Sequence, residues 1–311
     1  MWKKENVTFT EGFVLLGLVK TQLLQKVFFG LFFIIYSMTI LGNLVIILVI
    51  RSDSALHKPM YYFICNLSIL EIIYTTTITP NTLRNFLTED RSISFVGCFT
   101  QMFFFIGLGS SECVLLSVMA YDRYIAICHP LLYSKYMNSF CCFQLVLLSY
   151  FLGSLNSLLH TVLAAVLPYC REHQVAHFFC DHPALLKLSC RDTFPNELVI
   201  LLVGGFVVIG GLMLTIVSYI CILRTVLNIQ SNAARPKAFS TCGSHLLVVT
   251  LYFGTIISTY MHPGFSSSTK LNRVLSIMYG VLTPLINPII YSFRNADFIN
   301  GIQKTLIMIK H

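Results

Sequence analysis

Residues 98–126 read CFTQMFFFIGLGSSECVLLSVMAYDRYIA, and this stretch decides the fold. Its apolar run is continuous rather than alternating, which favours a membrane-spanning helix over a strand of a barrel. The 25 residues from Cys98 to Arg123 span about 37 Å of helix at 1.5 Å per residue, enough to cross a bilayer. The stretch therefore predicts a transmembrane helix with Cys98 near one membrane face and Arg123 near the other.

Apolar segments of similar length recur along the chain. Together the predicted spans are 25–50, 59–81, 98–126, 140–166, 197–223, 237–261 and 270–292. Of the 311 residues 56% are hydrophobic and 11% charged, whereas a soluble domain carries about 25% charged residues. So few charges could not cover a soluble surface of this size. We predict an all-α fold, a seven-transmembrane helix bundle that forms a single domain over residues 1–311.

The two ends of the chain are expected to lie outside the lipid. Residues 1–24 precede the first span and contain no apolar signal-peptide core, so that span should act as an uncleaved signal. Residues 294–311 follow the bundle, which covers 25–293, and predict a short C-terminal amphipathic helix on the membrane surface. Its apolar positions recur at helical spacing: Phe298, Ile302, Leu306 and Ile309.

The number of basic residues on each side does not reveal which way the chain is oriented in the membrane. Ten Lys and Arg lie on one side and eleven on the other, so the positive-inside rule does not decide. Asn6-Val7-Thr8 is a glycosylation sequon, which has meaning on the luminal side. The four cysteines in or beside the predicted outer loops form an even set, which suits an oxidising compartment: Cys98, Cys170, Cys180 and Cys190. Both features predict a multi-pass plasma-membrane protein with an extracellular N-terminus and a cytoplasmic C-terminus.

Asp122 and Arg123 end the central predicted span near the inner interface. A charge at this depth is costly unless it is paired or reaches the headgroups. The carboxylate could hold the guanidinium in one state and release it to a partner in another. Alternatively, Arg123 could be a simple helix anchor.

The longer string Met119-Ala120-Tyr121-Asp122-Arg123-Tyr124-Ile125-Ala126-Ile127-Cys128-His129-Pro130-Leu131 resembles the signature of mammalian odorant receptors, a branch of the rhodopsin-like G-protein-coupled receptors. Further matches follow in the expected order over roughly residues 6–305. They are Gly42-Asn43, Leu56-His57-Lys58-Pro59-Met60-Tyr61, His177-Phe178-Phe179-Cys180-Asp181, Ser218-Tyr219, 237–246 (KAFSTCGSHL) and 284–291 (PLINPIIY).

This resemblance implies an odorant receptor, not an enzyme. It would bind small, mostly neutral apolar odorants in the helical bundle and activate a stimulatory, olfactory-type heterotrimeric G protein that raises cAMP. A metabolite sensed outside the nose would leave the same sequence pattern. The net charge of +8 suits anionic inner-leaflet lipid rather than nucleic acid. The resemblance also implies the disulfides Cys98–Cys180 and Cys170–Cys190, since sequence alone leaves three connectivities.

The resemblance assigns two polar groups of residues. The G-protein switch would comprise Asp122, Arg123, Tyr219, Asn287, Pro288 and Tyr291. A polar core at mid-membrane would comprise Asn43, Glu71, Glu112 and Asn287. In the wider superfamily such a core can hold a sodium ion, but here Glu71 stands where an Asp is usual and its longer side chain could fill the cavity. Two close acids cannot both be charged without a cation, so a shared proton is the alternative; no other cofactor is expected.

The expected ligand pocket is apolar with a few hydroxyls, as small-ligand sites usually are. No acid lies above Glu112 on the inward face of its span, which argues against an amine ligand. The candidate residues are Met102, Phe105, Ile106, Gly109, Ser110, Val203, Phe206, Val207, Phe253, Ile256, Ile257 and Tyr260. Each could equally be bundle packing, and His160 could be a pocket group or an interhelical hydrogen-bonding residue. Phe253 is expected at the inward place usually held by a tyrosine, which would remove a hydroxyl from the pocket floor.

Two other classes of function fit the sequence less well. A transporter or channel would often show repeated halves and broken spans, which the sequence lacks. A membrane enzyme would show a catalytic motif, and neither HExxH nor GxSxG occurs. Cys170, His173, His177 and Cys180 have zinc-like spacing, but the disulfides account for these cysteines better.

Overall fold

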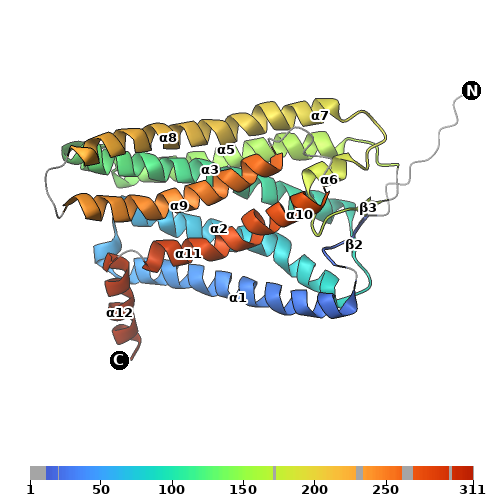
Figure 1. Cartoon of the computed structure of the whole chain (residues 1–311), viewed down its shortest axis with the longest axis horizontal. Coiled ribbons are helices and arrows are strands. Elements are labelled where there is room, and N and C mark those ends of the chain that lie inside the picture. Colours follow the sequence, from blue (N-terminus) through green and yellow to red (C-terminus); the bar gives the residue numbers. More distant parts are fainter. Residues whose placement is uncertain are drawn as a thin grey trace, which may run out of the picture.

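This computed structural model describes residues 12–19, 21–170, 173–228, 234–260, 269–293 and 296–310. Within these ranges, seven helices are long and apolar enough to cross a membrane. They run side by side along the long axis of the molecule (Figure 1). The all-α seven-helix bundle predicted from the sequence is therefore confirmed, together with the short C-terminal helix.

The elements follow one another in the order of Figure 1. They are β1 (Phe13–Leu15), α1 (Gln22–Ser52), η1 (Ser54–Leu56), α2 (Pro59–Leu87), β2 (Ser92–Ile93), α3 (Phe95–Cys128), η2 (Pro130–Leu132), α4 (Tyr133–Tyr136), α5 (Ser139–Ala165), β3 (Gln174–Val175), α6 (His182–Leu186), α7 (Phe194–Val199), η3 (Ile200–Gly204), α8 (Gly205–Leu227), α9 (Ala234–Tyr260), α10 (Thr269–Ile277), η4 (Met278–Leu282), α11 (Thr283–Phe293) and α12 (Ala296–Lys310).

Helix α3 is the most enclosed of the spanning helices and packs against α2, α5 and α8. Small residues allow the backbones to approach, as is usual between membrane helices. A Cβ on Gly153 of α5 would lie 2.4 Å from the carbonyl oxygen of Gly107. The Ser117 hydroxyl donates to the carbonyl of Gly211 on α8 at 2.9 Å. These contacts place α3 where it can line a cavity shared with its neighbours.

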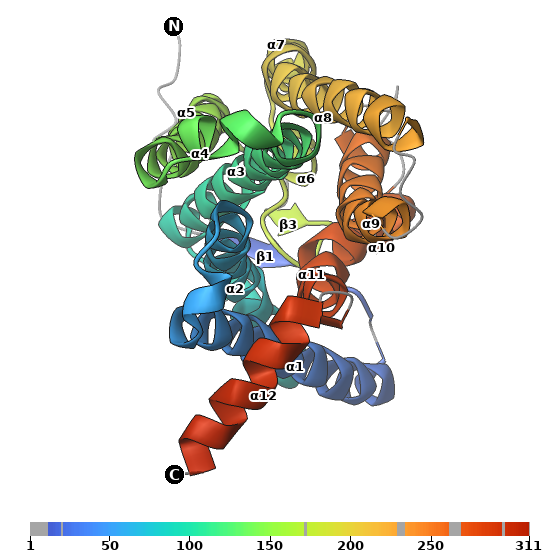
Figure 2. The ribbon, with the colours of Figure 1, turned by 90° about the vertical axis from the view of Figure 1, so that its left-hand side faces the viewer.

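Helices α1, α11 and α12 form the other side of the bundle, and α12 turns away from its axis (Figure 2). Asn43 donates to the carbonyls of Thr39 at 3.0 Å and of Pro284 at 3.4 Å, which joins α1 to α11. The Lys304 ammonium of α12 lies 3.1 Å from Oδ2 of Asp53, which follows α1. The backbone N–H of Ala55 and the Lys304 ammonium lower the pKa of the Asp53 carboxyl.

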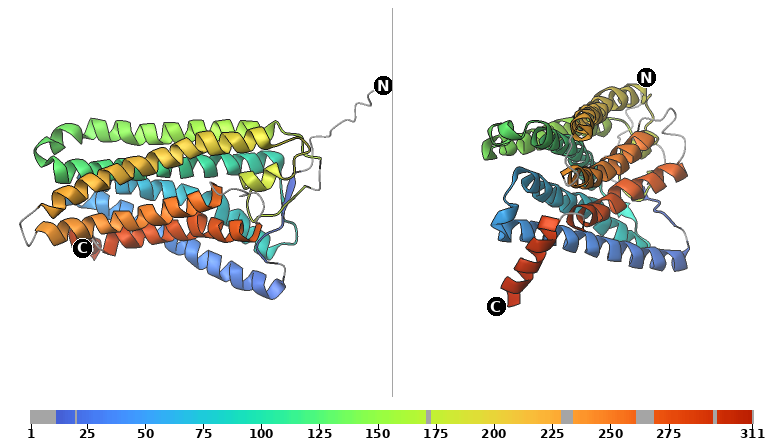
Figure 3. Two further views of the ribbon diagram at one scale, coloured as in Figure 1. Left: turned by 45° about the horizontal axis from the view of Figure 1, so that its top comes forward. Right: turned by 60° about the vertical axis from the view of Figure 1, so that its left-hand side comes forward.

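A three-stranded sheet, in the order β2-β1-β3, closes the end of the bundle that carries the disulfides. Strand β1 pairs antiparallel with β2 and parallel with β3. We call this the disulfide end and the other the Arg123 end; β1 and α12 lie at opposite ends (Figure 3). A Cβ on Gly12 would lie 1.8 Å from the Ile93 carbonyl oxygen, so β1 requires glycine there.

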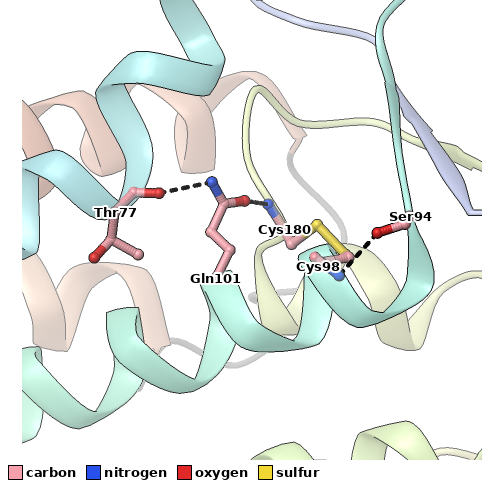
Figure 4. The surroundings of a disulfide bond; sticks show 6 residues. Thr77, Ser94, Cys98, Gln101 and Cys180 are labelled. Atoms are coloured by element: carbon pink, nitrogen blue, oxygen red, sulfur yellow. Dashed lines mark hydrogen bonds between the residues drawn. A yellow bond between two sulfur atoms is a disulfide. The ribbon is translucent and has the colours of Figure 1, made fainter.

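The structure joins Cys98 to Cys180 and Cys170 to Cys190, the pairing that the resemblance implied. Gln101, one turn below Cys98, donates to the Thr77 carbonyl and accepts from the Cys180 N–H, both at 2.9 Å (Figure 4). The first bridge and this amide therefore tie α2, α3 and the loop before α6 into one unit.

Three features differ from the expectations. Helix α2 continues through Pro80 to Leu87, whereas its predicted end was residue 81. The spans predicted at 197–223 and 270–292 each contain a π-helical turn, η3 and η4. The sheet was not predicted, because its strands are two or three residues long and pair through distant parts of the chain. The sequon at Asn6 lies outside the described residues.

Candidate functional site

A cavity of about 100 Å³ lies inside the bundle near the disulfide end. A cavity of roughly 150 Å³ in another protein holds benzene, so this one suits a molecule of a few heavy atoms. Residues from α2, α3, α5, α6, η3, α8, α9 and η4 line it: Tyr74, Phe105, Ile106, Gly109, Ser110, Cys113, Asn156, His160, His182, Ile200, Gly204, Val208, Ile256, Tyr260 and Tyr279.

The predicted pocket residues divide into two groups. The structure places one group in the cavity wall: Phe105, Ile106, Gly109, Ser110, Ile256 and Tyr260. It places the other group outside the wall: Met102, Val203, Phe206, Val207, Phe253 and Ile257. The α3 candidates are mostly retained because α3 is a regular helix. Met102 is fully buried, but it packs among the aromatic residues beneath the sheet.

Half of the misplaced candidates lie in the fifth span. The π-helical turn η3 contains more residues than an α-helical turn. It therefore rotates the side chains that precede α8 relative to those of α8 itself. Ile200 and Gly204 of this turn line the cavity, together with Val208 of α8. Val203 lies outside, and the Phe206 side chain is 79% exposed on the outer surface of the bundle. Apolar periodicity could not reveal this shift, because both faces of the span are apolar.

The expectation for Phe253 is wrong. The inward aromatic residue of α9 is Tyr252, which is fully buried and donates a hydrogen bond to the Gly109 carbonyl of α3. Phe253 instead lines a second hollow, of about 480 Å³, between α8 and α9, and Ile257 lines the same hollow. The hydroxyl expected to be missing from the floor is therefore present, and it joins α9 to α3.

A chain of hydroxyls closes the cavity toward the disulfide end. Tyr260 donates to Asp181 Oδ1 at 3.1 Å and lies 2.7 Å from the Tyr279 hydroxyl, which lies 3.1 Å from the Ser276 hydroxyl. Burial raises the pKa of the Asp181 carboxyl to about 7. These hydrogen bonds connect the loop after Cys180 to α9, η4 and α10. They therefore join the segment that closes this side of the cavity to the last two spans.

Several lining residues were not predicted. They are Tyr74, Cys113, Asn156, His182, Ile200, Gly204, Val208 and Tyr279, while His160 had been left open. The one available signal was the run Cys180-Asp181-His182, because a residue next to a bridged cysteine must lie near the end of α3.

The structure brings most of the predicted polar core together. Asn287 donates to Glu71 Oε1 and is within reach of Glu112 as well. Glu71 Oε2 and Glu112 Oε1 are buried and have no hydrogen-bond partner among the described residues. Asn43 joins this group indirectly, through its bond to the α11 backbone at Pro284.

Four of the six predicted switch residues lie toward the Arg123 end: Asp122, Arg123, Tyr219 and Tyr291. The other two lie elsewhere, because Asn287 belongs to the polar core and the Pro288 side chain lies beside Gly42 of α1. Asp122 Oδ1 accepts from the Tyr133 hydroxyl of α4 at 2.9 Å. Within the described ranges, Asp122 Oδ2 and Arg123 Nε have no hydrogen-bond partner. Tyr219 of α8 lies 2.8 Å from His245 Nδ1 of α9. The Tyr291 hydroxyl near the end of α11 is buried without a partner in the same part of the chain.

A family model described as olfactory receptor matches residues 32–309. The chain belongs to the olfactory receptor family. Olfactory receptor 5AP2 of Mus musculus is 45% identical over 304 residues, which cover 98% of this chain and 96% of that receptor. Olfactory receptor 8I2 of Homo sapiens is 46% identical over 301 residues, which cover 97% of each chain. Members of this family are G-protein-coupled receptors and not enzymes, so the chain is a multi-pass membrane receptor that senses odorants.

Proposed function

We propose that this olfactory receptor binds small, mostly neutral odorants in the cavity between α3, α5, α8 and α9, and that it activates a stimulatory olfactory-type G protein to raise cAMP. The observation that carries the proposal is the cavity itself. Among the described residues that line it, none carries an Asp, Glu, Lys or Arg side chain. A charged ligand would lose its hydration there without gaining a counter-charge, which is costly.

We propose that the disulfide end faces outward at the plasma membrane and the Arg123 end faces the cytoplasm. Disulfide bonds persist in oxidising compartments, and both bridges lie at one end of the bundle. Residues 1–24 would then be extracellular and 294–311 cytoplasmic.

Transmission to the G protein would run through α9. Tyr252 joins this helix to α3 directly below the cavity, and His245 joins it to Tyr219 of α8 two turns farther on. A ligand acts by stabilising one of two arrangements better than the other. In the active arrangement Tyr219 would leave His245 and approach Arg123 or Tyr291 as the inner end of α9 moves outward.

We infer that Glu71 and Glu112 share a proton rather than a sodium ion. Their unpartnered oxygens suit either one, and Na⁺ would be held by Glu71, Glu112 and Asn287. Glu71, however, already contacts Asn287 directly, so its side chain occupies the space between α2 and α11. Replacing Na⁺ by choline in the medium should then change basal cAMP by less than about twofold; a larger change would show that the cation binds.

The test of function is a panel of small neutral volatiles applied to cells that express the receptor with the olfactory stimulatory Gα subunit. At least one volatile should raise cAMP, and Arg123→Ala should not respond although it reaches the surface. If the receptor gave calcium responses through a promiscuous Gα subunit but no cAMP response, the proposed coupling to a stimulatory G protein would be refuted. The proposed odorant-binding cavity would still stand.

A further inference from the structure

One side of the cavity carries three buried side chains, each with one polar atom that lacks a hydrogen-bond partner among the described residues. We call Asn156 and His160 of α5 and His182 of α6 the polar edge. Their exposed fractions are 7%, 3% and 5%. Asn156 Oδ1, His160 Nδ1 and His182 Nε2 have no hydrogen-bond partner among the residues that the structure describes.

Packing gathers these groups against the same space. Asn156 precedes His160 by four residues and therefore lies on the same helix face. The ring centroids of His160 and His182 are 5.5 Å apart. Asn156 donates its amide N–H to the Ser110 hydroxyl of α3 at 2.9 Å, which leaves the carbonyl oxygen as its unpaired end. All three residues line the cavity.

The facing wall is aromatic. Phe105 of α3 stacks on Tyr74 of α2 with ring centroids 5.0 Å apart and lies 5.8 Å from Tyr279. This wall offers contact area to a hydrocarbon but few free polar groups, because the Tyr279 hydroxyl is already bonded to Tyr260. The cavity is therefore polar on one side and apolar on the other.

The charge state of His182 further limits the chemical class of ligand that the polar edge can bind. Burial lowers the pKa of His182 to about 3, so its imidazole is neutral at physiological pH. A neutral imidazole offers one N–H donor and one acceptor nitrogen. It cannot neutralise a carboxylate, and no Asp or Glu among the described lining residues could neutralise an ammonium group.

A metal ion does not account for the edge. The described residues contain no group of three or more His, Cys, Asp or Glu placed to hold a metal. A buried polar atom without a partner costs free energy comparable to a lost hydrogen bond, and a ligand that supplies the partner recovers it.

We propose that the polar edge selects neutral ligands that carry a carbonyl or hydroxyl oxygen, with the hydrocarbon part lying against the aromatic wall. The inference rests on the proposed function, because it specifies the ligand class of the same cavity. The oxygen accepts an N–H from His160 or His182, and a hydroxyl can donate in turn to Asn156 Oδ1. A pure hydrocarbon of the same shape leaves all three groups unpaired.

The experiment uses trios built on one small carbon skeleton, in keeping with the size of the cavity: cyclopentane, cyclopentanone and cyclopentanol, and equivalent trios on the straight-chain butane and pentane skeletons. Responses are read as calcium through a promiscuous Gα subunit, so that they do not depend on the natural G protein. Within each trio that evokes a response, the ketone or alcohol should be at least about fivefold more potent than the hydrocarbon. This is the effect expected from about one neutral hydrogen bond.

Variants of the edge test its residues. His160→Leu and His182→Leu should reduce the potency ratio within a trio toward one, and His160→Gln should restore part of it. His177→Leu is the matched control, because His177 is equally buried and unpartnered but packs on Phe178 and Phe179 outside the cavity wall. Surface labelling with antibody excludes variants that fail to fold, and the ratio is independent of expression level.

The outcomes separate the two proposals. Equal potency across a trio, or a ratio that His160→Leu and His182→Leu leave unchanged, overturns the role of the edge while the odorant site stands. Silence of all trios, with the wild-type chain at the surface, contradicts the odorant site and the edge together.

Discussion

The two ends of this receptor are held together in different ways. At the disulfide end, two covalent bridges, a three-stranded sheet and the Asp181–Tyr260–Tyr279 hydroxyl chain connect segments from the whole sequence. At the Arg123 end, α8 and α9 are joined by one side-chain hydrogen bond, Tyr219 to His245, among the contacts of the described residues. The comparison indicates a rigid disulfide end and an Arg123 end at which α8 and α9 can separate at small energetic cost.

The largest effect should come from breaking the rigid end. Cys98→Ser or Cys180→Ser should stop surface expression, measured by antibody labelling of intact cells. The bridge closes a separation of 82 residues, for which the chain-entropy model gives about 4.5 kcal/mol. The Cys170–Cys190 bridge closes 20 residues, for which the same model gives about 3.3 kcal/mol. Cys190→Ser should therefore be delivered better than Cys98→Ser; normal delivery and response of Cys98→Ser would remove the basis of the comparison.

The next largest effect concerns signalling at the opposite end. Arg123→Ala should abolish odorant-evoked cAMP and leave surface delivery largely intact, because Arg123 is expected to contact the G protein in the active state. Arg224→Ala, an exposed arginine in the last turn of α8, is the matched control and should keep most of the response. Retained signalling in Arg123→Ala would assign the residue a purely anchoring role.

Removing the bond between α8 and α9 should have a moderate effect. His245→Phe keeps a ring in place and removes the hydrogen-bond partner of the Tyr219 hydroxyl. A neutral hydrogen bond contributes about 1 kcal/mol, so basal cAMP should rise about fivefold. His129→Phe is the control, because its bond to Tyr124 at 3.0 Å connects neighbouring turns at the same end and not two spans. Unchanged basal activity in His245→Phe would show that this bond does not restrain α9.

The smallest effect is a pH dependence at the disulfide end. Burial raises the pKa of Asp181 to about 7 from 3.8, so the folded receptor binds a proton there that the unfolded chain releases. The resulting stability is complete below the unfolded pKa and is lost as the pH rises through about 7. Between pH 6 and 8 the expected loss is about 1.4 kcal/mol, or a fall of roughly 2–4 °C in the melting temperature.

Thermal unfolding of the purified receptor in detergent measures this dependence. Tyr260 donates to Asp181, and Lys187 lies close enough to oppose the shift. Because an amide does not bind or release a proton in this range, Asp181→Asn should melt at nearly the same temperature at pH 6 and pH 8. A wild-type receptor that is more stable at pH 8 than at pH 6 would reverse the assignment.

Regular helices allowed the sequence to predict six of the fifteen described residues that line the cavity. Counting turns back from Arg123 along α3 gives Gly109, Phe105 and Ile106, which the structure places in the cavity wall, and Met102, which it places outside. The prediction failed in the fifth span, where Val208 rather than Phe206 lines the cavity, and in α9, where Tyr252 rather than Phe253 faces α3. Helical periodicity identifies an inward face when polar and apolar positions alternate, and these two spans are apolar on several faces.

By itself the sequence determined the seven spans, the family motifs and the absence of an acid from the α3 side of the cavity. These properties depend on the local composition of each segment, since a helix in lipid must satisfy its own backbone. Tertiary structure alone decided the sheet at the disulfide end, the register of the fifth span and the place of His182 beside His160. Each of these depends on contacts between segments distant in the chain, and no local pattern of side chains specifies which distant partner a group will meet.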